Sequence, residues 1–331
     1  MDLKRIRAFT HQYTRKDDSL AAASYFGTFA VYFTALGLGI WALGAAHWAL
    51  SLPFIVLLGF ASVRLYVLQH DCGHASLFST RRRNDLAGRV LSVFTLTPYA
   101  VMRHNHNLHH AHVGNLDHRE DGEVHTMTLA EWQRAGRGRR MVYRLYRNPL
   151  VMLGLGGIYT YFIRYRWPRN TRDVGVAGVL LHNLAVLGWA GLLWMVAGAH
   201  GLIMLGASGL VAGVIGVFMV YLQHNFEDTH WDRRPDLNPQ YAALMGSSCL
   251  NLGHWWDIGT GNICYHDIHH FNPRIPSYRL RECHFAMDAV APMRRIGWGE
   301  ALASFRLKLW DEERGRLVPF PRETVREVAA A

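Results

Sequence analysis

Histidines gather in three short segments of this 331-residue chain, and their spacing in each segment suits the binding of a metal ion. The first segment reads HDCGH (70–74), the second HNLHH (106–110) and the third HDIHH (266–270). Because neutral imidazole nitrogen binds zinc, copper, iron and nickel well, the pattern predicts a metal centre built mainly from histidines. The candidate ligands are His70, His74, His106, His109, His110, His266, His269 and His270.

Helical geometry indicates which of these side chains act together. Residues four apart on a helix are about 40° apart around its axis, so His70 and His74 share one face. The three candidates of the second segment fall within an arc of about 100°, and the third segment repeats that spacing. His104 lies on the opposite side of the second segment's helix, and His112 lies at the margin of its ligand face. His224, at the end of an apolar stretch, is a predicted ninth ligand.

Eight or nine histidines are too many for one metal ion. A structural zinc site closes with four ligands, so the set predicts two ions. Carboxylates are scarce, since Asp71 and Asp267 each adjoin a histidine but point about 100° away from it around the helix. The residues therefore indicate a nitrogen-rich dinuclear centre. Two irons on such ligands would activate dioxygen, whereas two zincs would act as Lewis acids or assist hydrolysis, and the residues alone leave both open.

Polar residues near the histidines are candidates for hydrogen bonds to the metal-bound rings. A ligating imidazole usually donates its second ring N–H to a carboxylate, carbonyl or water. Glu227 is equally compatible with a solvated helix end, and 114–121 with a plain turn. The predicted supporting residues are Asp71, Asn115, Asp117, Asn225, Glu227 and Asp267.

Two long apolar stretches must position these segments. Residues 24–68 contain Arg64 as their only charged residue, and residues 174–223 contain no Asp, Glu, Lys or Arg. A membrane-spanning helix needs roughly 20 apolar residues, so each stretch is long enough for two spans with a turn between them. We therefore predict an all-α membrane protein with four transmembrane helices in two hairpins. The predicted spans are about 25–46, 51–70, 176–197 and 202–223.

Lysine and arginine indicate the orientation of these spans. The two predicted turns lack both residues, whereas 1–16, 81–172 and 233–316 are rich in them. Because positive charge accumulates on the cytoplasmic side, both termini and all three histidine segments are predicted to be cytoplasmic. Residues 71–149 and 224–331 would then form a helical cap that carries the histidines.

Other features fit this arrangement. Residues 150–165 are apolar but short for a span, which predicts an interfacial helix, with a buried core helix as the alternative. The N-terminus lacks the apolar core and cleavage site of a signal peptide. The net charge of +10 fits basic flanks beside anionic lipid, and no basic–aromatic pattern indicates binding to nucleic acid. The four cysteines form no CxxC pair and lie in predicted cytoplasmic segments, so no disulfide is expected.

The three segments together resemble the histidine boxes of the integral-membrane fatty acid desaturase and hydroxylase superfamily. HDCGH followed by ASL is similar to the first box of acyl-lipid desaturases of the delta-12/omega-6 type, and HNLHHAHVGNLDHREDGEVHTMT to the second. QHNFEDTHW and GNICYHDIHHFNPRIPSYRLRECH match further pieces, so the resemblance covers about 65–285. Asp267 stands where the family often has another histidine.

The resemblance implies a single desaturase-like domain over 1–331 with a non-haem di-iron centre. The nine histidines named above would be its ligands, and dioxygen its co-substrate, in the desaturation of a fatty acyl chain. It implies an integral protein of the bacterial inner membrane. The sequence carries no haem-attachment motif, cysteine quartet or GxGxxG loop, so electrons must come from a ferredoxin or cytochrome. Candidate docking residues are Arg81, Arg82 and Arg83, or Arg137, Arg139 and Arg140, which are equally suited to lipid headgroups.

Alternatives remain at this stage. The same di-iron site would serve a hydroxylase, an acetylenase, an alkene-forming oxidative decarboxylase or a carotenoid-modifying enzyme. A divalent-metal transporter and a zinc-dependent membrane hydrolase are alternatives from other classes. Transporter ligands should lie near the bilayer midplane, whereas these cluster outside the predicted spans on one side, which disfavours transport.

Overall fold

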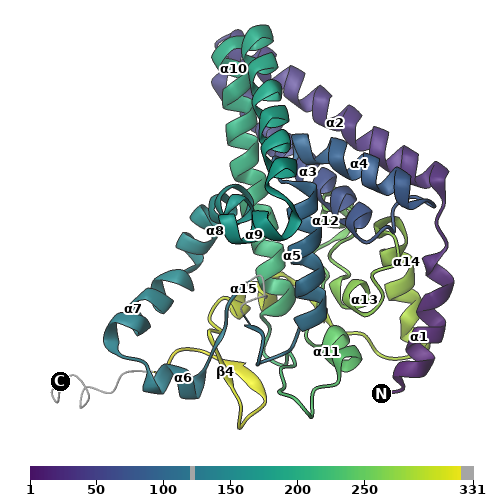
Figure 1. Ribbon diagram of the computed structural model, residues 1–331, viewed down its shortest axis with the longest axis vertical. Helices are drawn as coiled ribbons and strands as arrows, with labels where there is room; N and C mark the ends of the chain where they lie inside the picture. Colours follow the sequence, from purple (N-terminus) through teal and green to yellow (C-terminus); the bar gives the residue numbers. More distant parts are fainter. Residues whose placement is uncertain (120–123, 322–331) are drawn as a thin grey trace.

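The computed structural model describes residues 1–119 and 124–321, and the protein is mostly helical (Figure 1). The first helices are α1 (Leu3–His11), α2 (Asp18–Gly44), α3 (Trp48–Gly73), α4 (Arg81–Phe94), α5 (Tyr99–His112), α6 (Leu129–Arg134), α7 (Arg137–Tyr146) and α8 (Pro149–Gly157). They are followed by α9 (Pro168–Val174), α10 (Val176–His224), α11 (Pro239–Met245), α12 (His254–Gly259), α13 (His266–Phe271), α14 (Ser277–Ala286) and α15 (Trp298–Ser304).

Shorter elements complete the chain. The single-turn helices are η1 (Gln12–Thr14), η3 (Ile158–Ile163, a π-helix), η4 (Arg164–Arg166) and η5 (Met287–Ala289). The strands are β1 (Met127–Thr128), β2 (Cys249–Leu250), β3 (Arg295–Ile296), β4 (Leu309–Asp311) and β5 (Arg316–Val318). β4 pairs in parallel with β1 and antiparallel with β5, and β2 pairs in parallel with β3.

Among the described residues, three helices are long and apolar enough to cross a membrane, namely α2, α3 and α10. They extend together from one end of the molecule (Figure 1). Many of their large apolar side chains are exposed, among them Phe26, Trp41 and Leu184. A helix that is apolar on every side is stable only in a protein core or in lipid. These exposed apolar faces therefore suit a lipid environment.

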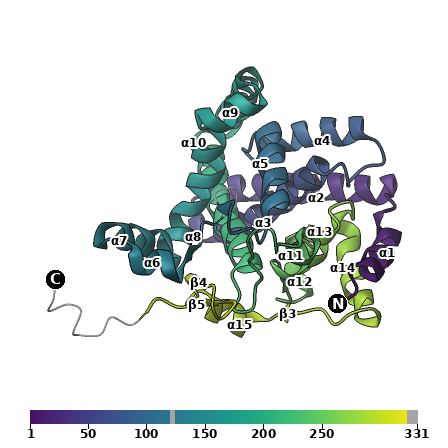
Figure 2. The same ribbon diagram turned by 60° about the horizontal axis from the view of Figure 1, so that its bottom comes forward.

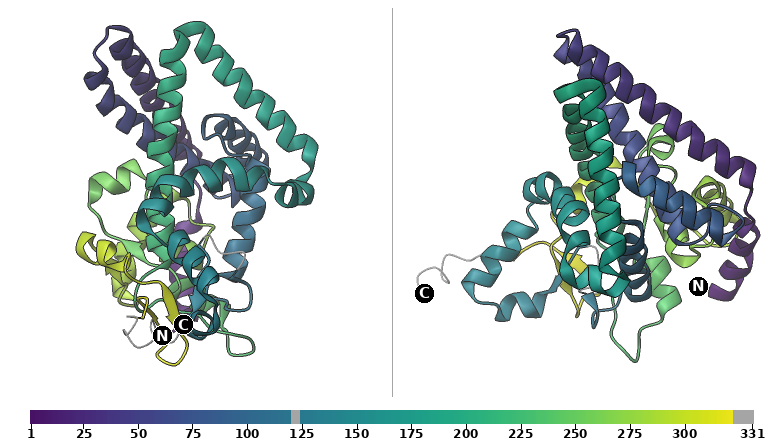
Figure 3. Two further views of the ribbon diagram at one scale, coloured as in Figure 1. Left: turned by 90° about the vertical axis from the view of Figure 1, so that its left-hand side faces the viewer. Right: turned by 45° about the horizontal axis from the view of Figure 1, so that its top comes forward.

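The 49-residue helix α10 changes direction at Gly198. Gly198 has φ 56° and ψ −141°, a conformation that glycine adopts without the steric cost of a Cβ. The two halves of α10 run in opposite directions on either side of this residue (Figure 3). They pack closely next to the turn, because a Cβ at Gly201 would lie 2.8 Å from the carbonyl oxygen of Leu193. The predicted turn at 197–201 contains this reversal.

Arg64, the charged residue of the first apolar stretch, joins three elements. Its Nε donates to Thr28 Oγ1 of α2 (3.0 Å), and its guanidinium also bonds to Ser24 and to the carbonyl of Ile258 in α12. A charged side chain near a lipid-facing surface is costly unless its donors are satisfied. These contacts satisfy Arg64 and hold α2, α3 and α12 together.

The opposite end of the molecule is a cap of shorter helices and strands. The arm formed by α6, α7 and α8 lies on one side of it, and α1 with α14 on the other (Figure 2).

Arg147, which is fully buried, connects the arm to the core. It donates to Asn225 Oδ1 (2.6 Å), just after α10, and to Thr126 Oγ1 (2.9 Å), while Lys308 Nζ donates to its carbonyl (2.6 Å).

The region predicted as one helix at 150–165 is composite. It consists of α8, the π-helix η3 and the 3₁₀ turn η4. Leu150, Leu155, Tyr159 and Ile163 are exposed along it. The segment therefore presents an apolar face, although its helical geometry changes twice over its length.

Candidate metal centre

The nine predicted ligands all lie where helices end in the cap. His70 belongs to the last turn of α3, and His74 directly follows that helix. The second box forms the last turns of α5, the third box forms most of α13, and His224 is the last residue of α10. Four chain segments far apart in the sequence therefore direct imidazoles at one region.

The histidines form two groups, in each of which the potential ligand atoms lie within 4.8 Å of one another. Cluster 1 contains His70, His74, His106, His110 and His269. Cluster 2 contains His109, His224, His266 and His270. The structure thus brings all nine predicted residues together and divides the second and third boxes between two sites.

The Nε2 atoms face one another within each cluster. Adjacent pairs are 2.7 to 3.0 Å apart in cluster 1 and 3.0 to 3.2 Å apart in cluster 2. The Nε2 atom of His74 is buried without a hydrogen-bond partner. A buried polar atom without a partner is costly, so these converging nitrogens suit ions between them.

Hydrogen bonding fixes the tautomer of His224. Its Nδ1 lies 2.9 Å from the carbonyl oxygen of Gly246. Because a carbonyl only accepts, Nδ1 carries the proton and donates it there. The Nε2 atom of the neutral ring then turns a lone pair toward cluster 2, as a metal ligand requires.

Burial keeps most of these rings neutral. The pKa of seven histidines is lowered, first by desolvation and then by the positive charges of neighbouring groups. The pKa of His109 falls to about 3. The seven are His74, His106, His109, His110, His266, His269 and His270. At neutral pH they are in the unprotonated form that binds metal.

The donor set of cluster 1 fits iron better than zinc. Cluster 1 offers five imidazoles, one more than the tetrahedral shell that zinc usually takes. Among the residues that the structure describes, neither cluster includes a carboxylate. Iron accepts imidazole ligands and a larger coordination number, so the residues of both clusters fit two non-haem irons.

His104 and His112, which flank the second box, lie outside both clusters. Nε2 of His104 is 3.7 Å from a carboxylate oxygen of Asp173 in α9, which agrees with the predicted orientation away from the ligand face. His112 stacks on His118, with ring centroids 4.6 Å apart.

Among the predicted supporting residues, Asp71 lies close to a ring nitrogen of a predicted ligand. Its carboxylate is fully buried, and Oδ1 is 3.4 Å from Nδ1 of His70. Oδ2 accepts a hydrogen bond of 2.7 Å from the backbone N–H of Ser277, at the start of α14. Asp71 thus connects the first box to the helix that follows the third.

Asp267 contacts a histidine that the sequence analysis missed. Its Oδ1 is 3.3 Å from Nδ1 of the fully buried His284, and Nε2 of His284 accepts from Arg295 Nε at 3.1 Å. Through its contact with His284, Asp267 therefore links α13 to α14. The only sequence signal for His284 was its position in the last segment of the family resemblance.

Two predicted supporting residues after α10 have other partners. The Glu227 carboxylate is exposed and pairs with Arg316 at 3.0 Å. The Asn225 side chain donates to the carbonyl of Ser304 and accepts from Arg147. The predicted hydrogen bonds from these residues to a ligand histidine are therefore wrong. The ring of His224 uses the Gly246 carbonyl instead.

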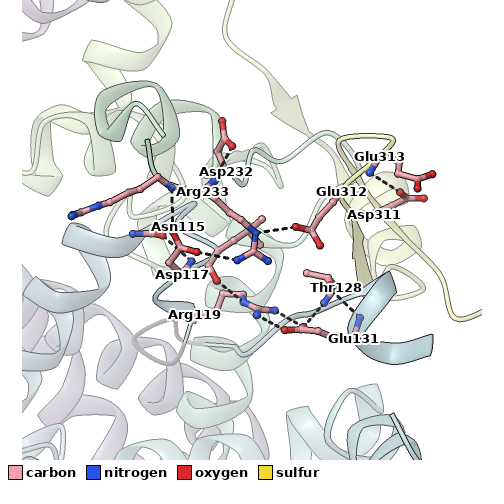
Figure 4. A network of polar contacts seen from close by, with 12 residues as sticks. Asn115, Asp117, Arg119, Thr128, Glu131, Asp232, Arg233, Asp311, Glu312 and Glu313 are labelled. Atoms are coloured by element: carbon pink, nitrogen blue, oxygen red, sulfur yellow. Dashed lines mark hydrogen bonds and ion pairs between the residues drawn. The ribbon is translucent and has the colours of Figure 1, made fainter. Parts of the chain in front are cut away.

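Asn115 and Asp117 also have a structural role (Figure 4). Asn115 Oδ1 accepts from the backbone N–H of Asp117 (2.9 Å), which forms a tight turn. The Asp117 carboxylate accepts from Arg233 Nη1 (2.9 Å) and from the backbone N–H of Arg234 (3.1 Å). The hydrogen bonds described for Asn115 and Asp117 are those of a turn and an ion pair, and they do not reach a ligand histidine.

An apolar cavity reaches both clusters. His70 and His106 of cluster 1 and His109 and His266 of cluster 2 line it, and it encloses about 1040 Å³ with its mouth included. One face of α10 forms its longest wall, mostly with small side chains. The lining residues of that wall are Leu205, Ser208, Gly209, Ala212, Gly213, Gly216, Met219, Val220 and Gln223.

The fold and the site define a helical protein with membrane-type helices and two histidine clusters suited to metal ions beside an apolar cavity. A family model described as "Fatty acid desaturase" matches residues 46–301. The chain is 32% identical to a "Fatty acid desaturase" of Bacillus subtilis (strain 168), over 96% of this chain and 89% of that protein. The chain belongs to the fatty acid desaturase family.

More distant relatives extend this similarity. An "sn-1 oleoyl-lipid 12-desaturase" of Anabaena variabilis is 25% identical over 74% of this chain and 68% of its own length. A "Delta(9) fatty acid conjugase-like enzyme" of Dimorphotheca sinuata is 26% identical over 75% and 70%. The predicted resemblance is confirmed, and the protein is an oxidoreductase of the desaturase class. The transporter and hydrolase alternatives are not favoured.

Proposed function

We propose that the protein is a membrane-embedded, dioxygen-dependent di-iron desaturase of acyl chains. The observation that carries this proposal is the convergence of nine histidines, six of them buried and three half-buried, in two clusters that both reach an apolar cavity. Family membership supports the reaction class. The ligands would be the nine histidines, with Asp71 behind His70 and Asp267 behind α13.

Two bound irons would supply the activation of dioxygen and the removal of hydrogen from an unactivated C–H bond. The chain's own residues do the rest. The apolar wall of α10 holds an acyl chain straight and keeps water out, so that one pair of carbons meets the clusters. The desolvated neutral imidazoles keep their lone pairs available as ligands.

The electron balance requires a partner. Removal of two hydrogens from the chain yields two electrons, and reduction of one O2 to two waters takes four. An external one-electron carrier, a ferredoxin or a cytochrome, would supply the other two. Among the proposed docking arginines, Arg81 pairs with Asp85 and Arg83 with Asp18, whereas Arg137 is exposed and suits an acidic carrier.

The membrane arrangement follows from the elements. We propose four spans, formed by α2, α3 and the two halves of α10, with the composite segment from α8 to η4 lying at the interface. The basic termini and the cap would be cytoplasmic, in a bacterial inner membrane. The whole chain would be one catalytic domain.

Expression in a host with defined lipids, followed by mass spectrometry of its fatty acids, tests the reaction. A new double bond is expected, and it should disappear in H110A. A product with a hydroxyl, a triple bond or a terminal alkene would instead assign hydroxylation, acetylenation or oxidative decarboxylation to the protein. Metal analysis of the purified protein should give about two irons per chain. Active protein that contains zinc alone would overturn the di-iron proposal.

A further inference from the structure

The short helix α13 carries three of the nine predicted ligands, but its own hydrogen bonds do not fix its rotation. It has six residues, and isolated helices shorter than about 12 residues are marginal in water. Contacts with the rest of the protein must therefore set the direction of its imidazoles. A rotation of α13 about its axis would move all three rings relative to the clusters at once.

Asp267 is the polar side chain of α13 that belongs to neither cluster. The other two residues of the helix that are not predicted ligands, Ile268 and Phe271, pack in the apolar core, and apolar contact is not directional. A hydrogen bond, in contrast, restricts both distance and angle. Oδ1 of the buried Asp267 accepts from the backbone N–H of Ile268 (2.8 Å) and lies 3.3 Å from Nδ1 of His284. The contact with His284 is thus a directional link from α13 to α14.

Arg295 determines which ring nitrogen of His284 carries the proton. The Nε of an arginine only donates, so Nε2 of His284, 3.1 Å away, accepts. The proton of the neutral ring is then on Nδ1, the atom that faces Asp267, and it is donated to the carboxylate. If the proton were on Nε2 instead, Nδ1 would present a lone pair to the carboxylate oxygen, and the contact would be repulsive.

Arg295 is held in place by its side chain and by its backbone. Its Nη2 pairs with Asp288 Oδ2 at 2.8 Å. Its backbone belongs to β3, where it lies opposite Cys249 of β2. Cys249 also forms a bridge with Tyr265, the residue that precedes α13. One strand residue therefore aligns both ends of the hydrogen-bond chain that runs from β3 through α14 to α13.

We infer that His284 is a positioning residue of the metal centre. Through Asp267 it fixes the rotation of α13, so that His266 and His270 point at cluster 2 and His269 points at cluster 1. The inference rests on the proposed function, since it takes these histidines to be metal ligands. Loss of an outer hydrogen-bond partner of this kind typically lowers metal affinity by about 10- to 100-fold.

Packing alone is the competing explanation. His284 is fully buried, and its ring centroid lies 5.0 Å from that of Tyr265, so removal of the ring would also leave a cavity. Three substitutions separate the two roles. The amide nitrogen in H284N takes the place of Nδ1 and still donates to Asp267, whereas the amide in H284Q reaches the place of Nε2. H284F fills the space with an apolar ring that has no donor.

Iron(II) affinity of the purified full-length protein tests the inference without turnover. It is measured anaerobically by competition with a chelator for the wild type and the three variants. H284F and H284Q should bind iron(II) about tenfold more weakly or worse, because neither donates to Asp267. H284N should keep most of the affinity. R294Q, which changes the neighbouring arginine that pairs with Asp228 and Glu300, should match the wild type.

The order of the variants decides between positioning and packing. Affinity in H284F equal to that of the wild type, or above that of H284N, overturns the inference. R295Q removes the donor to Nε2 at a half-buried position, and it tests the same hydrogen-bond chain if thermal unfolding shows that a His284 variant is misfolded. Unchanged affinity in R295Q would then overturn the inference. A wild type that binds no iron(II) overturns the proposed metal centre as well, whereas unaffected variants of an iron-binding wild type overturn this inference alone.

Discussion

Position within each box decides which cluster a histidine joins. In the second box, His106 and His110 are four residues apart and belong to cluster 1, whereas His109 belongs to cluster 2. In the third box the pair at the same spacing belongs to cluster 2, and His269 crosses to cluster 1. The 60° offset between the first histidine of a box and the one three residues later is enough to point the latter at the neighbouring cluster. Each of the two boxes thus contributes two histidines to one cluster and one histidine to the other.

Substitution of His109 should have a far larger effect than substitution of His104. His109 is buried in cluster 2, while His104 contacts Asp173 on the far side of α5. H109A should lower desaturation by about 100-fold or more, because loss of a ligand should cost at least as much as loss of an outer hydrogen-bond partner. H104A should retain most activity and both irons. Product analysis and iron content measure both effects, and similar losses in the two variants would contradict the ligand-face argument.

Asp71 should tune metal affinity through His70. D71N keeps the shape of the side chain and its acceptor for the Ser277 N–H, but it removes the negative charge 3.4 Å from His70 Nδ1. Iron affinity should fall by about tenfold or more, as for other outer-sphere partners. D173N, at the exposed contact with His104, is the matched control. A chelator titration compares them, and equal iron retention in both variants would rule out this role.

At the scale of elements, the sequence predicted the faces of helices but not how the helices cross. The spacing of the boxes was sufficient to select the histidines that cluster and to exclude His104. The division into two clusters depends on the angle at which α5 meets α13, which no local pattern encodes. Glu227 was misjudged because it follows the end of α10, where helical spacing no longer applies. The Gly246 carbonyl that orients His224 is a backbone group and leaves no sequence signal.

The small residues on one face of α10 should set the chain length that the cavity accepts. Gly209 lines the cavity 14 residues before Gln223, about 21 Å along the helix at 1.5 Å per residue. A Cβ there meets no atom within 4 Å, so the side chain in G209L would grow into the cavity. Activity on the longest chains should fall by about tenfold, the effect of 1–3 kcal/mol of overpacking.

The control for this prediction is G206L. Gly206 is on the same helix and also has open space around it, but it is exposed and does not line the cavity. Competition between acyl chains of different length, followed by mass spectrometry, compares the two variants. An identical chain-length profile in G209L and the wild type would show that this wall does not limit the length of the acyl chain.

For the whole molecule, metal removal should make stability depend on pH. Without ions, the folded protein holds neutral histidines with lowered pKa values, that of His109 about 3, whereas the unfolded chain protonates near the ordinary value of 6.5. Acidification from 6.5 toward 3 therefore stabilises the unfolded chain, and this contribution is absent above 6.5. The melting temperature of iron-depleted protein should fall steadily below pH 6.5. Iron-loaded protein should melt higher at pH 7.5, and no difference there would contradict metal binding by the clusters.

The arrangement of the whole chain in the membrane predicts which surfaces face each side. If α2, α3 and both halves of α10 span the bilayer, the turns around Ala45 and Ala199 lie outside the cell and Ala303 lies inside. The four native cysteines are buried and free, so single introduced cysteines report accessibility with little background. An impermeant maleimide should label A45C and A199C in intact spheroplasts, and A303C only after lysis. Labelling of A199C only after lysis would mean that α10 does not cross the membrane twice, and the two-hairpin arrangement would be wrong.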